Sequence, residues 1–258
     1  MPAAFATAPR LLAARQALVL CAWLAAAAAV IFWLGRATDI DLLLADAVYD
    51  AATRSFPWRH AWLAETFNHT ILKGLLTLAG GGFMLAAIAD ALRPRPARLA
   101  LDRLRLRVVA LSALLVPFLI STLKQASAAH CPWDLARYGG SEPYLRLFEA
   151  LPPGVAAGHC LPAGHASSAL WLVSLGVAWL PAQPGLARRA AVGALLFGGL
   201  VGWMQQLRGA HFLTHTLWSI WLACAVVLAL VAVLQWQALW RGKATATCAA
   251  VEDAGGLL

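Results

Sequence analysis

Residues 217–234 read LWSIWLACAVVLALVAVL, a stretch without a charged residue that is long enough to cross a bilayer as one helix. The whole chain has the same character, because 61% of its 258 residues are hydrophobic, only 12% are charged and the mean hydropathy is +0.70. Soluble domains carry about 25% charged residues. The sequence therefore predicts an integral membrane protein.

Six apolar segments are expected to span the membrane as helices, at about 15–35, 71–92, 107–124, 166–182, 190–207 and 214–240. The first has a long apolar stretch and no clear cleavage site, so we expect an anchor that is retained. No repeat of fixed period divides the chain. We expect an all-α fold, a six-transmembrane-helix bundle that forms one domain over residues 1–258, with a flexible tail from about residue 242.

The basic residues give a net charge of +8 and lie mainly at the two chain ends and in two connections between the expected spans. They are Arg10, Arg15, Arg93, Arg95, Arg98, Arg103, Arg105, Arg107, Arg188, Arg189, Arg241 and Lys243. The positive-inside rule assigns these segments, and hence both termini, to the cytoplasm. This distribution follows the membrane topology and argues against nucleic acid as a partner. The other three connections then face outward.

The first outward connection is expected to form a short amphipathic helix at the membrane interface. Thr38 is a candidate cap, and apolar and acidic positions alternate at helical spacing: Ile40, Leu43, Leu44, Ala47 and Val48 on one face, Asp39, Asp46 and Asp50 on another. Such a helix covers a site, steers lipid or acts as a structural cap over the bundle.

Two histidines lie at the outward ends of expected spans. His165 ends the run Pro162-Ala163-Gly164-His165, and His211 lies in the short turn Gly209-Ala210-His211-Phe212. An ionisable group this close to hydrocarbon is costly and is a functional candidate for that reason. The long connection between residues 124 and 165 is also typical of a functional loop. Together these features indicate one active site at the outer membrane surface.

The motifs around these histidines resemble those of the type 2 phosphatidic acid phosphatases, six-span lipid phosphatases related in fold to vanadium haloperoxidases. The family motifs are Lys-x6-Arg-Pro, Pro-Ser-Gly-His and Ser-Arg-x5-His-x3-Asp. The matching residues are Lys124 and Pro132, then Pro162, Gly164 and His165, and finally His211. The departures are Cys131 and Gln205 for the two arginines, Ala163 for serine and His215 for aspartate.

The resemblance implies a two-step hydrolysis without metal or cofactor. His211 would attack phosphorus to form a phosphohistidine, and His165 would protonate the departing oxygen and later activate water. His215 would orient His211, as the aspartate does in the family.

The resemblance also implies a phosphate clamp in which Lys124 is the first cation. The backbone around Ala163 and Gly164, at the start of a helix, would add N–H donors, since helix N-termini favour anions. A lysine at a helix end is also placed to snorkel toward lipid headgroups, and that alternative stays open.

The arginines missing at Cys131 and Gln205 weaken this clamp, because phosphoryl transfer depends on neutralising the phosphate oxygens. We expect Arg208, one helical turn from Gln205, to supply the missing positive charge. Gln205 itself is also expected to bind the phosphate. Arg137 and Arg146 in the long loop are further candidates. The alternative for Arg208 is a side chain that snorkels toward headgroups.

The implied substrate is a phosphate monoester or diphosphate of a membrane lipid, at the outer face of a bacterial cytoplasmic membrane. Phosphatidic acid, phosphatidylglycerol phosphate, a polyprenyl diphosphate and lipid A all remain open, as does the oligomeric state. Alternatives are a lipid phosphotransferase and a non-catalytic lipid-phosphate binding protein. A transporter is less favoured, since transporter sites lie near the bilayer midplane.

Two of the five cysteines lie in the long outward loop. We expect a disulfide between Cys131 and Cys160, because an outward loop of a bacterial envelope protein is in an oxidising compartment. The rival is a zinc site that adds His130 and His159 to the two sulfurs.

Overall fold

The computed structural model describes residues 10–95 and 99–255, and the side chains up to residue 240. This part of the chain is helical, without a β-strand. Its elements are α1 (Ala14–Ala37), α2 (Ile40–Asp46), η1 (Leu63–Leu72), α3 (Lys73–Leu92), α4 (Ala100–Gln125), η2 (Pro132–Asp134), η3 (Ala136–Tyr138), α5 (Gly164–Leu170), η4 (Trp171–Trp179), α6 (Pro184–Leu207) and α7 (Leu213–Gly255).

Five helices within these residues are long and apolar enough to cross a membrane, which confirms a helical membrane protein. They cover Ala14–Ala37, Leu63–Leu92, Ala100–Gln125, Pro184–Leu207 and Leu213–Trp240. The segment expected at 166–182 instead forms the seven residues of α5 followed by the nine residues of the 3₁₀-helix η4. At their usual rises these extend roughly 28 Å together, close to the thickness of the hydrocarbon core. The six-span count stays a prediction.

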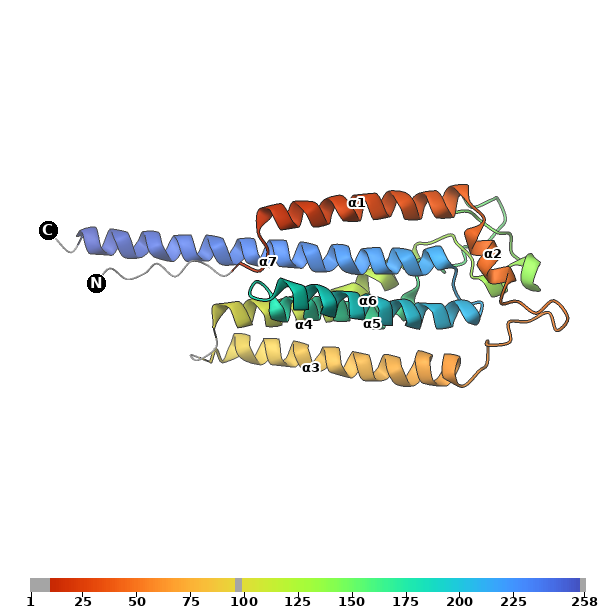
Figure 1. Cartoon of the computed structure of the whole chain (residues 1–258), viewed down its shortest axis with the longest axis horizontal. Helices are drawn as coiled ribbons and strands as arrows, with labels where there is room; N and C mark the ends of the chain where they lie inside the picture. The colour runs from red at the N-terminus through yellow and green to blue at the C-terminus, as the bar shows by residue number, and fades with distance from the viewer. Residues whose placement is uncertain (1–9, 96–98, 256–258) are drawn as a thin grey trace.

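The long helices run alternately up and down the bundle (Figure 1). As a result α1 begins and α7 ends on the same side, while α2 and residues 126–163 gather at the other side, which we call the loop end. Because α7 continues past residue 242 to Gly255, the expected tail is helical there; its flexibility stays a prediction, as does the cytoplasmic location of the termini.

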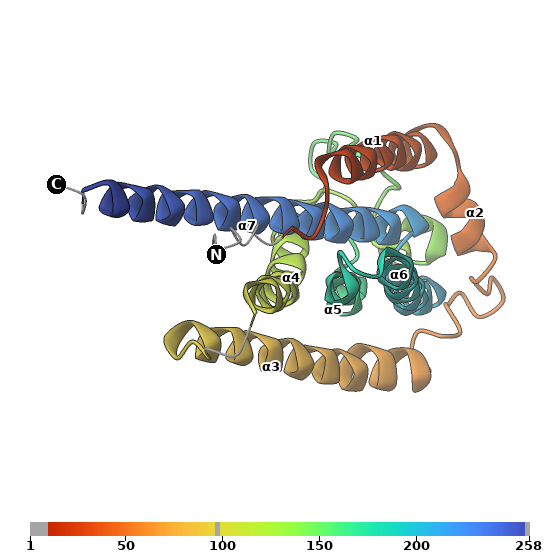
Figure 2. The same cartoon turned by 60° about the vertical axis from the view of Figure 1, so that its left-hand side comes forward.

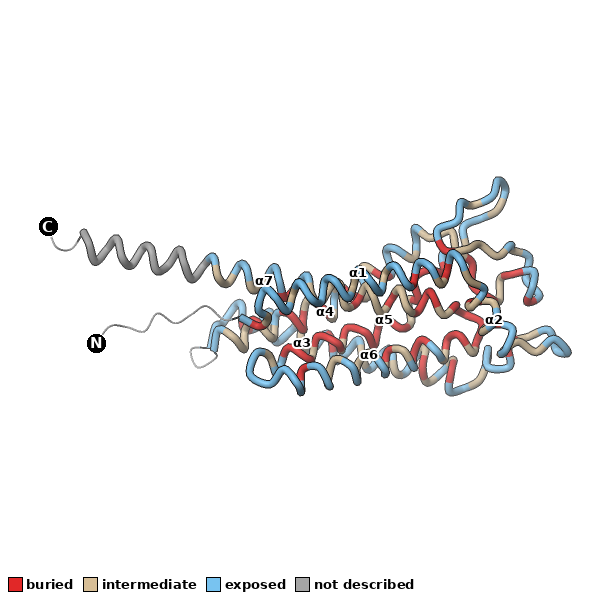
Figure 3. The backbone as a smooth tube through the Cα atoms, turned by 45° about the horizontal axis from the view of Figure 1, so that its top comes forward, coloured by how far each residue is buried: buried red, intermediate tan, exposed pale blue. Residues whose placement is uncertain are grey.

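The core lies between α4, α5, η4, α6 and α7, and includes Val108, Ile120, Leu170 and Trp171. By contrast α1 packs along α7 at the edge of the bundle (Figure 2). Large apolar side chains of α1 are exposed, for example Trp23 at 70%. The exposed residues follow the outer faces of the helices and the buried ones lie between them (Figure 3). This is the surface expected of a helix bundle surrounded by lipid.

Ion pairs and hydrogen bonds join α2, with Asp39 directly before it, to residues 126–163 and to α7. Arg137 binds Asp46 with an Nη2–Oδ2 distance of 2.6 Å, and Arg146 binds Asp39 at the same distance. The buried Asp41 carboxylate accepts the backbone N–H of Thr214, at the start of α7, at 3.0 Å, and the Thr214 hydroxyl as well. These contacts support the interpretation of α2 as a structural cap. They also engage Arg137 and Arg146, the two further candidates for the phosphate clamp, in ion pairs with α2.

The expected disulfide joins Cys131 to Cys160, with their Cα atoms 5.3 Å apart. This confirms the pairing and removes both sulfurs as zinc ligands. The rival zinc site with His130 and His159 is therefore not formed.

Candidate active site

His165 and His211 face each other at the loop end of the bundle. His165 is in the first turn of α5, and His211 is in the short turn between α6 and α7. Nδ1 of His165 lies 3.4 Å from Nε2 of His211. His211 is only 2% exposed. The structure thus brings together the two histidines that the sequence separates by a long stretch of chain.

Backbone hydrogen bonds hold the three motif segments together. The N–H of Ala163 donates to the carbonyl oxygen of His215 at 3.1 Å, and the hydroxyl of Ser219 lies 3.0 Å from the carbonyl oxygens of both residues. The N–H of Trp133, directly after the first motif, donates to the carbonyl oxygen of Gly209 at 3.0 Å. Because these bonds involve the main chain, they fix the histidines independently of their side chains.

The turn that carries His211 requires glycine at position 209. Gly209 has a φ of +71°, in the left-handed region that favours glycine. A Cβ there would lie 2.4 Å from the ring of Phe56, which packs directly on the turn. Both the backbone conformation and the close ring exclude a larger residue.

Lys124 lies near the end of α4, on a cavity of about 670 Å³ that it shares with Gly164 and His165. Its Cδ is 3.6 Å from the point that a Cβ on residue 164 would occupy. Lys124, Gly164 and His165 are therefore brought together, as the resemblance implies. Ala163 is buried behind them, and its N–H already donates to His215.

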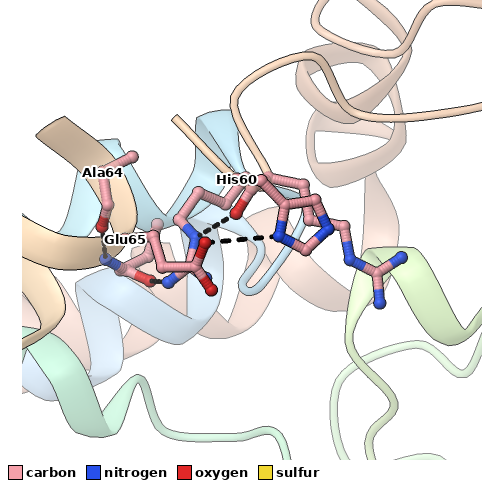
Figure 4. Close-up of polar contacts among 6 residues, drawn as sticks. His60, Ala64 and Glu65 are labelled. Atoms are coloured by element: carbon pink, nitrogen blue, oxygen red, sulfur yellow. Dashed lines mark hydrogen bonds and ion pairs between the residues drawn. The ribbon is translucent and has the colours of Figure 1, made fainter. Parts of the chain in front are cut away.

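Gln205 and Arg208, which we expected at the phosphate, make hydrogen bonds to other parts of the protein. Nε2 of Gln205 donates to the carbonyl oxygen of Ala64 at 3.3 Å, and Nη1 of Arg208 donates to Oε1 of Gln205 at 3.0 Å. Arg208 also donates to the carbonyl oxygen of Arg59 at 3.0 Å and to Glu65 at 3.3 Å. Figure 4 shows these polar contacts around Ala64 and Glu65. Both side chains connect α6 to η1 and the residues just before it.

His215 lies edge-on to His211, with the ring centroids 5.8 Å apart, and its buried Nδ1 has no hydrogen-bond partner among the described residues. Within the same part of the chain no hydrogen bond joins the two rings. Instead, Nδ1 of His211 lies 3.4 Å from Sγ of Cys160. The disulfide therefore occupies the side of His211 on which we expected the orienting residue.

Two further basic residues lie at the site but belong to none of the three family motifs. The ring centroid of His69, in η1, is 4.3 Å from that of His165, and Lys73, at the start of α3, lines the cavity with Lys124. The sequence does contain a signal for them. They are basic residues four positions apart at one end of an apolar helix, a spacing that places them on the same face.

The charges around the two facing histidines are predominantly positive. Burial, followed by the neighbouring His69, Lys124, Lys73 and Arg208, lowers the pKa of His165 to about 3. Burial, followed by the neighbouring His165 and His215, lowers the pKa of His211 well below its ordinary value of 6.5. The His211 ring is therefore neutral at neutral pH, next to a cavity that favours an anion.

One family model matches the chain, that of the PAP2 superfamily, over residues 105–239. This range begins in α4 and includes Lys124, the disulfide, His165 and His211. No curated protein and no solved structure matches the chain significantly.

Proposed function

The chain belongs to the PAP2 superfamily, whose members generally hydrolyse phosphate esters, and on this basis we propose that it is a phosphatase of membrane lipid phosphates or diphosphates. The rest of the proposal concerns the substrate class, the catalytic steps and the membrane face.

The observation that carries the lipid assignment is the shape and chemistry of the cavity beside His165. The part of the cavity at the loop end is basic and is lined by Lys73, Lys124 and His165. From there it continues between α3 and α4 along apolar residues as far as Met84, roughly 16 Å below Lys73 at the usual helix rise. A charged headgroup site that opens into an apolar groove within membrane-spanning helices fits a lipid phosphate, with the phosphate at the loop end.

In the proposed mechanism Nε2 of His211 attacks phosphorus in line and forms an N–P bond while the P–O bond to the alcohol or phosphate leaving group breaks. His165 gives its proton to the leaving oxygen. His165 then takes a proton from water, the resulting hydroxide attacks the phosphohistidine, and His211 and inorganic phosphate are released. The negative charge of the bound phosphate favours the protonated form of His165 that the first step requires.

The surroundings of His211 support this role. Its Nδ1 faces Sγ of Cys160, which has no proton in the disulfide and can act only as a weak acceptor. The tautomer with the proton on Nδ1 is therefore favoured, and this tautomer leaves the lone pair on Nε2. Because Nε2 is 3.4 Å from Nδ1 of His165, the His165 ring has to turn aside as the phosphoryl group enters.

We place the site at the outer face of a bacterial cytoplasmic membrane. The support is the position of Arg93 and Arg95, in the connection from α3 to α4, and of Arg103, near the start of α4. These residues lie at the opposite side of the bundle from the loop end (Figure 1). The cavity provides its own cations through lysine, so the proposed reaction needs no metal.

The test is phosphate release by the purified protein in lipid nanodiscs, from phosphatidic acid, phosphatidylglycerol phosphate, a polyprenyl diphosphate and lipid A. We expect release from at least one of them, unchanged by EDTA and lost in His211→Ala. Glycerol 3-phosphate, which lacks the apolar tail, should be a much poorer substrate than phosphatidic acid. Labelled phosphate that appears on a second lipid would indicate transfer rather than hydrolysis. Equal release by wild type and His211→Ala would remove the enzymatic assignment.

A further inference from the structure

Two side chains outside the family motifs share the space next to His165. The ring of His69 is in contact with that of His165, with centroids 4.3 Å apart and planes inclined by 46°. Lys73, four residues later, lines the same cavity from α3, and Lys124 lines it from α4. A phosphate at His165 would therefore have a lysine on each of two facing helices.

The segment that carries His69 is held in place by α6. Asn68, which is buried, donates from Nδ2 to the carbonyl oxygen of Val201 at 3.1 Å. One turn away, Gln205 and Arg208 bind Ala64 and Glu65 of the same segment. These bonds connect α6 to the π-helical turns of η1, whose wider hydrogen-bond pattern is rare and is often found at functional sites.

The family positions for arginine are thus used differently in this chain. Gln205 replaces an arginine, yet its amide binds the main chain of η1 rather than facing the cavity. Cys131 replaces the other arginine, and its sulfur is consumed in the disulfide. The lost cations need a substitute, because an uncompensated phosphate would be poorly bound in a half-buried site.

We propose that His69 and Lys73 are phosphate-binding residues of this active site and take the place of the two missing arginines. The inference rests on the proposed phosphatase function, which it extends by two residues. Lys73 and Lys124 bind the phosphate oxygens from opposite walls, each as a point charge with several N–H donors. His69 donates an imidazole N–H to a further oxygen. Gln205 and Arg208 are positioning residues that act through η1.

The decisive comparison uses pairs of variants that keep or remove the binding group. Lys73→Arg keeps the charge and Lys73→Met removes it; His69→Gln keeps an N–H donor and His69→Leu removes it. His60→Gln is the matched control, since the His60 side chain is 79% exposed and binds the exposed carboxylate of Glu65 at 3.2 Å. Because Lys73 is exposed, neither of its variants should affect folding, and thermal melting in detergent checks all five.

Two readouts are measured, the binding of inorganic phosphate by ³¹P NMR and the KM and kcat for the best lipid phosphate. We expect Lys73→Met and His69→Leu to weaken phosphate binding and to raise KM by about tenfold or more, as for a lost hydrogen bond to a charged group. Lys73→Arg, His69→Gln and His60→Gln should stay within a few-fold of wild type.

The outcomes separate this inference from the function on which it rests. If the wild type hydrolyses lipid phosphate while Lys73→Met and His69→Leu bind phosphate and turn over as well as it does, the two residues are not ligands and the proposal is wrong. If the wild type releases no phosphate, the proposed function fails, and phosphate binding by the same variants still decides the ligand assignment. If the wild type binds no phosphate, the ligand assignment is wrong.

Discussion

Removal of the disulfide between Cys131 and Cys160 should lower both stability and activity, and the cost in stability follows from the size of the loop it closes. The two residues are 29 positions apart. In the chain-entropy model a loop of this size contributes about 3.6 kcal/mol to the free energy of unfolding at 25 °C. The loop lies outside the five membrane-spanning helices, so its unfolded state is an ordinary flexible chain to which the model applies.

The activity should also fall, because the disulfide is part of the surroundings of His211. Sγ of Cys160 is 3.4 Å from Nδ1 of His211 and 3.2 Å from the carbonyl oxygen of Ala210. Removal of the sulfur leaves a gap beside Nδ1 of His211, the ring atom whose surroundings favour one tautomer. We expect a several-fold loss of kcat with little change in KM, since the lysines proposed to bind phosphate are on other helices.

The assay begins from a parent in which Cys21, Cys224 and Cys248 are alanine, so that the disulfide is the only target of a reductant. Its free energy of unfolding in mixed dodecyl maltoside and SDS micelles is compared with that of the parent carrying Cys131→Ala and Cys160→Ala. TCEP should shift the parent by about 3 to 4 kcal/mol and leave the double variant unchanged. If the oxidised and reduced parents unfold at the same free energy, the reasoning about this loop is refuted.

Three further predictions follow from the site. Gly209→Ala should cost about 2 to 4 kcal/mol in thermal or SDS unfolding, because its φ of +71° and the Phe56 ring both oppose a Cβ; an unchanged midpoint would contradict the turn. Asp41→Ala should cost about 1.5 to 3 kcal/mol in the same assay, since it leaves the buried Thr214 donors unpaired, and Asp41→Asn should recover part of this. The lowered pKa of His211 keeps its ring neutral at pH 6.5, so protonation should begin only at more acidic pH; ¹⁵N-histidine NMR, assigned with His211→Ala, would refute this by a midpoint at or above 6.5.

The parts of the fold that sequence predicts well are those determined by hydropathy. An uninterrupted apolar stretch such as residues 217–234 has no alternative to a helix in a bilayer, so α7 was predictable, and α1, α4 and α6 for the same reason. The disulfide was predicted from the expected outward position of its loop. The 3₁₀ geometry of η4 was not, because an apolar run such as Trp171–Trp179 fits either helix type.

The site shows a sharper limit. His165 and His211 could be predicted because each lies in a recognisable motif, whereas the orienting role of His215 stays a prediction. His215 is four residues on, a spacing that allows proximity, whereas the side of the ring it would need is taken by Cys160. Similarly, Arg208 was expected at the phosphate, and only the folded structure shows that its guanidinium is in an ion pair with Glu65.

His69 could not be ranked from the sequence alone, because η1 lies before the apolar stretch of its helix and contains polar residues such as Asn68. The polar residues of η1 are explained only by the packing of α6 beside them, where the carbonyl oxygen of Val201 accepts a hydrogen bond from the Asn68 amide. The positions of the proposed phosphate-binding residues are therefore fixed by packing between helices that are distant in the sequence. A local sequence pattern does not contain this information.

The most direct test of the central claim, that His211 is a nucleophile facing His165 in one phosphate site, is to trap the intermediate. Purified protein is mixed with ³²P-labelled lipid phosphate, quenched in base within a turnover and digested. We expect a base-stable, acid-labile label on the peptide that contains His211, and none in His211→Ala. Turnover without label on that peptide, or activity that survives in His211→Ala, would contradict it.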